Sequence, residues 1–255
     1  MNDQQFDYVI PTYNSADTLE KCLSDIKRYG CPNEIICPDK FSDDGTRDIV
    51  ERHGAQVIDC GTSLGEARRI GAHEASTEWI GFVDSDVFVG DEWPEVFKYI
   101  DEKIGAIQAN PNHTFDKGSG LPYFLDIKPK LFGIYRPFTG ATLIRRDLVT
   151  TARIMEDCQA FEDWFLGRHV CRCGFDWLVV PVNVYHVEDH HESVRKRAWH
   201  AAALRRYLLS KKISMTEFFK IYLGFILFYL GKSEMDMLLY WFRGLIDDSW
   251  FEMER

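Results

Sequence analysis

Residues 79–86 read Trp-Ile-Gly-Phe-Val-Asp-Ser-Asp, a short apolar run that ends in two carboxylates one residue apart. Such a run, bounded by polar residues, is typical of a buried strand. Carboxylates at its end project beyond the sheet, and hard divalent cations prefer oxygen ligands. Acidic pairs of this kind are also common in solvated loops, so the surrounding sequence decides what this pair means.

The chain before this strand alternates apolar runs with helical patterns. Leu19, Cys22, Leu23 and Ile26 recur at helical spacing, and Gly30 follows them. Strands are predicted over 8–10, 34–37, 56–58 and 79–83, and helices over 19–26, 46–52 and 64–75. This alternation predicts an α/β fold with a mostly parallel, Rossmann-like sheet and flanking helices, with ligands beyond the carboxyl ends of the strands.

The chain after this strand is less regular. Residues 110–137 are rich in Gly, Pro and aromatic residues and are expected to form a long functional connection. Further strands are predicted over 141–144 and 177–184, a helix over 161–173, and helices from 193 onward. We therefore predict a catalytic domain over 1–192 and a helical, basic C-terminal extension over 193–255. The catalytic domain divides into a nucleotide half over 1–110 and an acceptor half over 111–192.

Four short segments of the first half resemble family 2 glycosyltransferases, which have the GT-A fold. The resemblance covers 7–97 closely and continues more thinly to about 200. Its segments are Asp-Tyr-Val-Ile-Pro-Thr-Tyr-Asn at 7–14, Pro-Asp-Lys-Phe-Ser-Asp-Asp-Gly-Thr at 38–46, Gly-Glu-Ala-Arg-Arg-Ile-Gly at 65–71 and Asp-Ser-Asp at 84–86. The resemblance implies transfer of a sugar from a nucleotide sugar with inversion at the anomeric carbon.

The resemblance implies a set of donor-binding residues, with Arg68 facing the diphosphate and Asp39 accepting from the base or ribose. They are Pro11, Thr12, Asn14, Asp39, Gly65, Arg68, Asp84 and Ser85. Arg68 could also be an ordinary solvent-facing helix residue. Lys40 departs from the family pattern, where a second Asp is usual, and it weakens any assignment of the base.

The resemblance also implies a divalent metal site, for Mn²⁺ or Mg²⁺, formed by Asp84, Asp86 and His186. The metal would neutralise the departing nucleoside diphosphate. His190 is the second choice for the histidine ligand. The alternative for both histidines is a polar loop rich in His and acidic residues.

Phe161-Glu162-Asp163-Trp164-Phe165-Leu166 resembles the family's acidic element at a helix start. The resemblance makes Asp163 the general base that deprotonates the acceptor hydroxyl, with Glu162 in support. Acidic residues are also favoured at helix N-termini by the helix dipole, so an ordinary first turn is the alternative. Gly140 and Ala141 resemble the small-residue turn on the acceptor side.

The predicted function is therefore metal-dependent transfer of a sugar from a UDP- or GDP-sugar to a hydroxyl of a glycan or lipid-linked acceptor, as in polysaccharide biosynthesis. A catalytically degenerate scaffold that binds nucleotide sugars is one alternative. A sugar-nucleotide pyrophosphorylase is another, but it would carry a Gly-rich phosphate loop where 11–14 read Pro-Thr-Tyr-Asn. A dehydrogenase is disfavoured, because no Gly-x-Gly-x-x-Gly follows a strand.

The amino-acid composition of the chain indicates where the protein is located and which partners it disfavours. The 255 residues are 45% apolar and 14% aromatic, which excludes a disordered chain. Their formal charge of −10 disfavours a general nucleic-acid binder. The polar start lacks the pattern of a secretory signal, and the seven scattered cysteines suit reduced thiols, so a cytoplasmic location is expected.

The charge is divided unevenly along the chain. Residues 193–232 hold nine basic residues and one acidic residue, so they carry +8 and the rest carries −18. Beside the basic residues lies an aromatic-rich run too short to span a bilayer. We expect peripheral contact with an anionic membrane through 193–245. Packing of these helices on the catalytic domain or in a homo-oligomer is the equally supported alternative.

Overall fold

The computed structural model describes residues 5–113, 137–153, 158, 160–187, 190–219, 221–223, 239, 242, 243, 245 and 246, without the side chains of 112, 113 and 190–197. The chain forms two compact units. The first comprises Met1–Thr114 with Pro137–Val187, and the second comprises Phe115–Arg136 with Glu188–Arg255.

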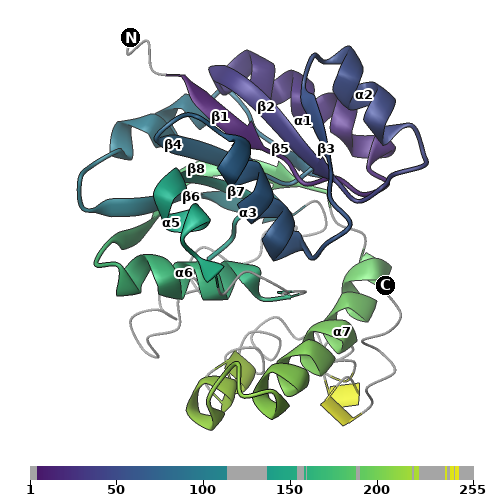
Figure 1. Cartoon of the computed structure of the whole chain (residues 1–255), viewed down its shortest axis with the longest axis vertical. Coiled ribbons are helices and arrows are strands. Elements are labelled where there is room, and N and C mark those ends of the chain that lie inside the picture. Colours follow the sequence, from purple (N-terminus) through teal and green to yellow (C-terminus); the bar gives the residue numbers. More distant parts are fainter. Residues whose placement is uncertain are drawn as a thin grey trace. The chain divides into compact units, whose positions relative to one another are not determined.

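The first unit contains an eight-stranded sheet in the order β3-β2-β1-β4-β7-β6-β8-β5 (Figure 1). The strands are β1 (Phe6–Val9), β2 (Pro32–Asp39), β3 (Gln56–Asp59), β4 (Trp79–Val83), β5 (Val87–Phe88), β6 (Ile104–His113), β7 (Ala141–Arg145) and β8 (Asp176–His186). The helices are α1 (Ala16–Tyr29), α2 (Thr46–Arg52), α3 (Leu64–Glu74), the 3₁₀ helix η1 (Trp93–Tyr99), α5 (Arg146–Thr150) and α6 (Glu162–Arg172). The predicted α/β class is confirmed.

The direction in which neighbouring strands pair changes along the sheet. Strands β3, β2, β1 and β4 pair in parallel, as the βαβ pattern predicts. In the second half, β7 pairs antiparallel with both β4 and β6, and β5 pairs antiparallel with β8. Only β6 and β8 are parallel there. The sheet is therefore mixed beyond β4, and β6 has no counterpart among the predicted strands.

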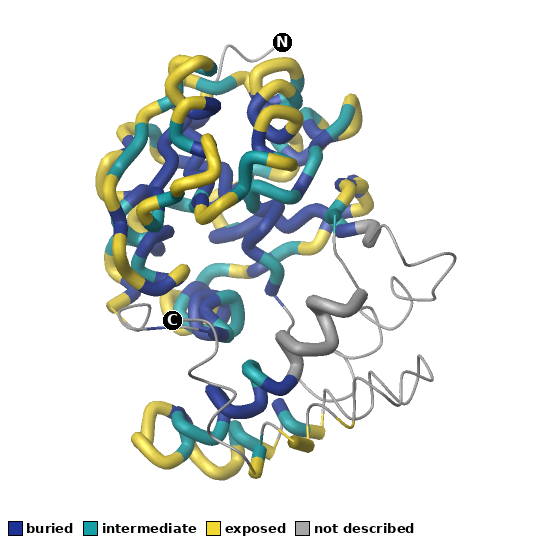
Figure 2. Tube along the Cα trace, turned by 90° about the vertical axis from the view of Figure 1, so that its right-hand side faces the viewer, coloured by how far each residue is buried: buried dark blue, intermediate teal, exposed yellow. Residues whose placement is uncertain are grey.

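Alternate residues of the central strands face opposite sides of the sheet, as a period of two requires. Tyr8 and Ile10 pack with the buried side chains of α1, α2 and η1, whereas Val9 packs with those of α3, α5 and α6. Helices therefore cover both faces of the sheet. Strands β1 and β4 are buried along their whole length, whereas β3 and β8 include exposed residues; Figure 2 shows the buried residues in dark blue. Sheets buried on both faces have near-continuous apolar strands, which is why 79–83 contains no polar side chain.

The second unit is helical in its described part. Helix α7 spans His190–Leu209, and residues 215–219 and 221–223 are also helical. The predicted helical C-terminal part is thus present. None of the described helices is long and apolar enough to cross a bilayer.

Candidate functional site

The carboxyl ends of β1 and β2 meet at Thr12 and Asp39, which are paired by an isolated parallel bridge. Thr12 donates its hydroxyl to Asp39 Oδ1 at 2.8 Å, and both side chains are buried. Ser42 also donates to Asp39, from its hydroxyl to Oδ1 at 2.6 Å and from its amide to Oδ2 at 2.9 Å. Two residues expected at the donor site are therefore in contact, and Ser42, within the quoted 38–46 segment, belongs with them.

Asn14 connects the turn after β1 to the loop after β2. Its backbone takes a left-handed conformation with φ of 45°, which asparagine adopts more readily than most residues. Its amide donates to Ser42 Oγ at 2.9 Å, and its side-chain oxygen accepts from the Asp43 amide at 3.1 Å. Asn14 therefore connects the two segments through both its backbone amide and its side-chain oxygen.

Asp44 organises the same loop, although no role is predicted for it from the sequence. Its carboxylate accepts from the Ala16 amide, and from the amide and the hydroxyl of Thr46. Burial raises the pKa of Asp44, but these hydrogen bonds outweigh burial and lower it overall. Gly45 follows with φ of 95°, a conformation that side chains disfavour. Asp44 thus holds together the starts of α1 and α2.

Lys40 and Phe41 occupy the positions where the sequence departs from the family pattern. The Lys40 ammonium lies 5.2 Å from the centroid of the Tyr13 ring, within the range of a cation–π contact. Phe41 is exposed and has a positive φ of 58°. Lys40 therefore contacts the Tyr13 ring, within the turn that runs from Thr12 to Asn14.

The Arg68 guanidinium lies inside the protein. Ser63 caps α3 by accepting from the Glu66 amide, and Arg68 sits one turn further along the helix. Its side chain is only 1% exposed. Nη1 donates to Glu162 Oε1 at 2.7 Å, and Nη2 donates to Asp84 Oδ1 at 2.5 Å. Arg68 thus bridges the end of β4 and the start of α6, rather than presenting its charge to solvent.

Asp84, Ser85 and Asp86 leave the end of β4 and are all partly exposed. Ser85 Oγ donates to Ser15 Oγ at 2.9 Å, just before α1. His186 Nε2 lies 3.3 Å from Asp86 Oδ2, because β5 pairs with β8 and sets Val87 opposite His186. Two of the predicted metal ligands are therefore in contact. The side chain of His190 lies outside the described residues.

The turn before β7 approaches these carboxylates closely. A Cβ atom added to Gly140 would lie 2.5 Å from both Asp84 Oδ2 and the Phe138 ring, so a side chain here would displace one or both of them. The Asp84 amide donates to the Gly140 carbonyl at 3.0 Å. Ala141 is buried in the core, in register with Val83. Gly140 therefore borders the site, and Ala141 supports it from within.

Thr139 is a further residue of this turn, and the sequence gives no direct signal for it. Its hydroxyl donates to Asp163 Oδ1 in a short hydrogen bond. Asp163 and Glu162 form the first turn of α6, where Phe161 precedes them with φ of 62°. The start of α6 is therefore held at two points, through Arg68 and through Thr139.

The carboxyl groups of Asp84, Asp86, Glu162 and Asp163 outnumber the positive charges around them. Burial raises the pKa of Asp84, and Asp86 and Asp163 add to the rise against the opposing effect of Arg68. Burial and the neighbouring Asp163 raise the pKa of Glu162 to about 8, again against Arg68. The charge of Arg68 is shared between Asp84 and Glu162, so the site favours an additional cation.

The side chains at this site suit a divalent cation for which a bound substrate supplies some of the coordinating atoms. Among the described residues, no three His, Cys, Asp or Glu side chains form a complete metal site. Mg²⁺ is commonly bound by one or two carboxylates together with substrate phosphates. Asp84, Asp86 and His186 offer such a partial set beside an excess of negative charge.

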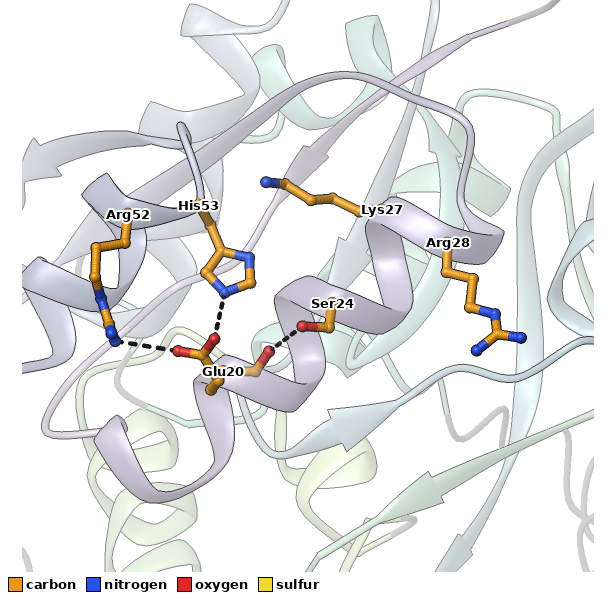
Figure 3. A pocket seen from close by; sticks show the side chains of 6 residues that line it. All are labelled: Glu20, Ser24, Lys27, Arg28, Arg52 and His53. Carbon is orange, nitrogen blue, oxygen red and sulfur yellow. Dashed lines mark hydrogen bonds and ion pairs between the residues drawn. The ribbon is translucent and has the colours of Figure 1, made fainter.

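A surface pocket of about 480 Å³ lies elsewhere on the first unit (Figure 3). Its lining residues are Glu20, Ser24, Lys27, Arg28, Arg52 and His53. Glu20 accepts from Arg52 at 3.1 Å and lies 2.9 Å from His53 Nε2. The pocket belongs to α1 and the end of α2 and contains none of the predicted site residues.

Comparison with known proteins gives the class to which this fold and site belong. Residues 7–154 match the family model described as glycosyl transferase family 2. This match covers more than half of the chain, and the chain therefore belongs to that family.

The individual curated relatives share low sequence identity with this chain over part of its length. "Glycosyltransferase GlyA" of Streptococcus pneumoniae is 28% identical over 130 residues, which cover 48% of this chain and 19% of that protein. The chain spans less than a fifth of the length of this and two further curated relatives.

Two solved structures share the GT-A fold. The mannosyltransferase PcManGT of Pyrobaculum calidifontis, in complex with GDP-Man and Mn²⁺, superposes with a TM-score of 0.68 at 16% identity, covering 98% of this chain and 88% of the other. Glucosyl-3-phosphoglycerate synthase of Mycobacterium tuberculosis, with Mn²⁺, UDP and glucosyl-3-phosphoglycerate, gives 0.59 at 20% identity, covering 79% and 78%.

Proposed function

We propose that this chain transfers a sugar from a UDP- or GDP-sugar to an acceptor hydroxyl, with inversion and with Mn²⁺ or Mg²⁺. The observation that carries the proposal is the convergence of Asp84, Glu162 and Asp163 around a buried arginine, beyond the end of a central strand. Family membership supports it, as do the two solved structures of the same fold, one bound to GDP-Man and Mn²⁺ and the other to UDP and Mn²⁺.

The nucleoside would lie against Thr12, Asn14 and Asp39. A carboxylate offers about four acceptor positions, and three hydrogen bonds from Thr12 and Ser42 already engage Asp39. Arg47 lies 3.6 Å from Oδ2. We infer that the remaining capacity of Oδ2 accepts from a base N–H or a ribose hydroxyl, while Thr12 and Ser42 keep the carboxylate in place.

Asp84, Asp86 and His186 would hold the metal. When bound, the metal supplies positive charge that stabilises the departing nucleoside diphosphate. Arg68 is occupied by Asp84 and Glu162, so we assign it the positioning of these carboxylates instead of a contact with the diphosphate.

Asp163 would act as the general base. It takes the proton from the acceptor hydroxyl, and the acceptor oxygen forms a bond to the anomeric carbon. The bond from that carbon to the diphosphate oxygen breaks on the opposite face, and its electron pair leaves with the diphosphate. Gly140 leaves room beside Asp84 because it lacks a side chain.

A thermal-shift screen of UDP- and GDP-sugars, with and without Mn²⁺, tests the donor and the metal together, since a ligand of the native state raises the melting temperature. We expect one class of nucleotide sugar to raise it, in a manner that requires Mn²⁺ and is lost in Asp86→Asn. The matched control Asp48→Asn, in α2, should retain the shift. Absence of any nucleotide-dependent shift would contradict the proposal, whereas a shift without any sugar transfer would favour a degenerate scaffold that binds nucleotide sugars.

We also propose that the second unit contacts an anionic membrane surface. Met215, Phe219 and Leu223 follow one another at a spacing of four residues and are 56%, 58% and 46% exposed. Such a spacing places them along one face of a helix. Leu239, Phe242 and Ile246 are a second exposed set, and the Phe242 ring contacts that of Tyr222 at 6.0 Å. The exposed Lys211 and Lys212 lie just before the first set.

Exposed apolar side chains next to basic ones match an interface of acyl chains and anionic headgroups. Burying one Phe side chain contributes about 1.5–3 kcal/mol, or roughly tenfold or more in partitioning. Phe219→Glu should therefore weaken flotation with phosphatidylglycerol vesicles at least tenfold, whereas Tyr99→Glu on the first unit should not. Equal flotation with neutral vesicles, or none at low salt, contradicts membrane contact and favours a protein partner for these helices.

A further inference from the structure

The turn formed by Phe138, Thr139 and Gly140 is fixed at three backbone points. The Phe138 amide donates to Gln108 Oε1 at 2.9 Å, and the Phe138 carbonyl accepts from Thr142 Oγ1 at 2.6 Å. The Gly140 carbonyl accepts from the Asp84 amide at 3.0 Å. The backbone of this turn therefore has little freedom to move relative to β4, β6 and β7.

Gln108 is itself held in place. Its side-chain oxygen also accepts from Trp177 Nε1 at 2.9 Å, and both side chains are buried. Gln108 lies on β6, which pairs with β7 on one side and with β8 on the other. A buried polar group with satisfied partners specifies one arrangement of its surroundings, because an unpaired alternative is costly. The sheet interior thus determines where the turn lies.

The fixed turn presents one side chain to the predicted base. The Thr139 hydroxyl donates to Asp163 Oδ1, and Thr139 is fully buried. Glu162, the neighbour of Asp163, is held separately by Arg68. The hydrogen bond from Thr139 therefore restrains the Asp163 carboxylate itself, and not merely the start of α6.

We propose that Thr139 is a positioning residue for Asp163: its hydroxyl holds the carboxylate in the orientation that takes the proton from the acceptor hydroxyl. This inference rests on the proposed function. Once Asp163 has taken the proton, Thr139 still donates to the same group, so the hydrogen bond persists through the transfer.

The test compares Thr139→Val, which removes the hydroxyl at nearly equal volume, with Thr139→Ser, which retains it. We expect Thr139→Val to lower kcat at least tenfold. Thr139→Ser should keep kcat within about threefold of the native value. Affinity for the donor, measured by titration calorimetry with Mn²⁺ present, should stay within twofold in both variants.

Thr77→Val is a matched control for the loss of a threonine hydroxyl. Thr77 bridges the Asp7 amide and the Trp79 carbonyl, at the opposite end of β4 from Asp84. The Thr77→Val variant should have lower thermal stability but an unchanged kcat. A native kcat in Thr139→Val, or an equal loss of kcat in Thr139→Ser, overturns the inference.

Asp163→Asn separates this inference from the function on which it rests. If Asp163→Asn is inactive and Thr139→Val is normal, only the positioning role is wrong. If Asp163→Asn is fully active, the proposed base is wrong, and Thr139 has no base to position.

Discussion

The Glu162 carboxylate gives the sharpest test of the electrostatics of the site. Burial and Asp163 raise its pKa from 4.5 to about 8, although Arg68 donates to it. Since the folded protein then binds the Glu162 proton more tightly than the unfolded chain, this residue favours folding at low pH. That contribution is lost as the pH rises from 4.5 to about 8.

The magnitude follows from the size of the shift. At 1.36 kcal/mol per pH unit, the rise from 4.5 to about 8 corresponds to about 5 kcal/mol, of which about 3 kcal/mol is lost between pH 5.5 and pH 9. Glu162→Gln has nearly the same shape, can still accept from Arg68, and does not titrate. The variant should therefore gain about 3 kcal/mol relative to the native protein over this interval.

Urea unfolding at pH 5.5 and pH 9, without metal, measures this difference, and the three buried tryptophans of the first unit report it. Comparing the variant with the native protein at each pH cancels the groups that titrate in both. Glu95→Gln is the control, because the exposed Glu95–Lys98 pair contributes little to stability. If Glu162→Gln loses stability relative to the native protein as the pH rises, the ion pair with Arg68 is net stabilising and our interpretation is refuted.

Two further predictions concern the same cluster. Mn²⁺ should raise the melting temperature of the native protein at pH 8, because it compensates the excess negative charge of the carboxylates. The rise should be smaller in Asp86→Asn. An equal rise in both proteins would show that Asp86 does not bind the metal. Gly140→Ala should weaken Mn²⁺ binding and lower turnover at least tenfold, because its Cβ would lie 2.5 Å from Asp84 Oδ2, whereas Gly90→Ala, with nothing within 4 Å, should be tolerated. Normal activity in Gly140→Ala would contradict the required close approach.

Much of the first half of the fold could be predicted from local patterns. The strands and helices of the βαβ units have short, regular periods. Asp84 directly follows β4, Asp39 is the last residue of β2, and Thr12 lies shortly after β1. The strand β7 is predicted, but its antiparallel direction is not, because pairing direction depends on residues far apart in the chain. Strand β6 is not predicted, because its apolar start is followed by Gln108 and Asn110 without a clear alternation.

The roles of single residues were harder to predict for the same reason. An arginine side chain on a helix is buried only where a carboxylate can pair with it. Glu162, which pairs with Arg68, lies 94 residues away in the chain. Thr139 and Asp163 are also in contact although they lie 24 residues apart in the chain. The predicted long connection over 110–137 lies mostly outside the described residues, as do Phe225, Ile226, Phe228 and Tyr229 of the aromatic-rich run.

The turnover of Asp163→Asn tests the central claim most directly. The measurement is release of nucleoside diphosphate from the donor identified by thermal shift, with Mn²⁺ present, alongside the affinity for that donor. Loss of a general base lowers the rate by about 10²–10⁴-fold. We predict a fall of at least a hundredfold with donor affinity within about threefold of the native value, and undiminished release would contradict the account.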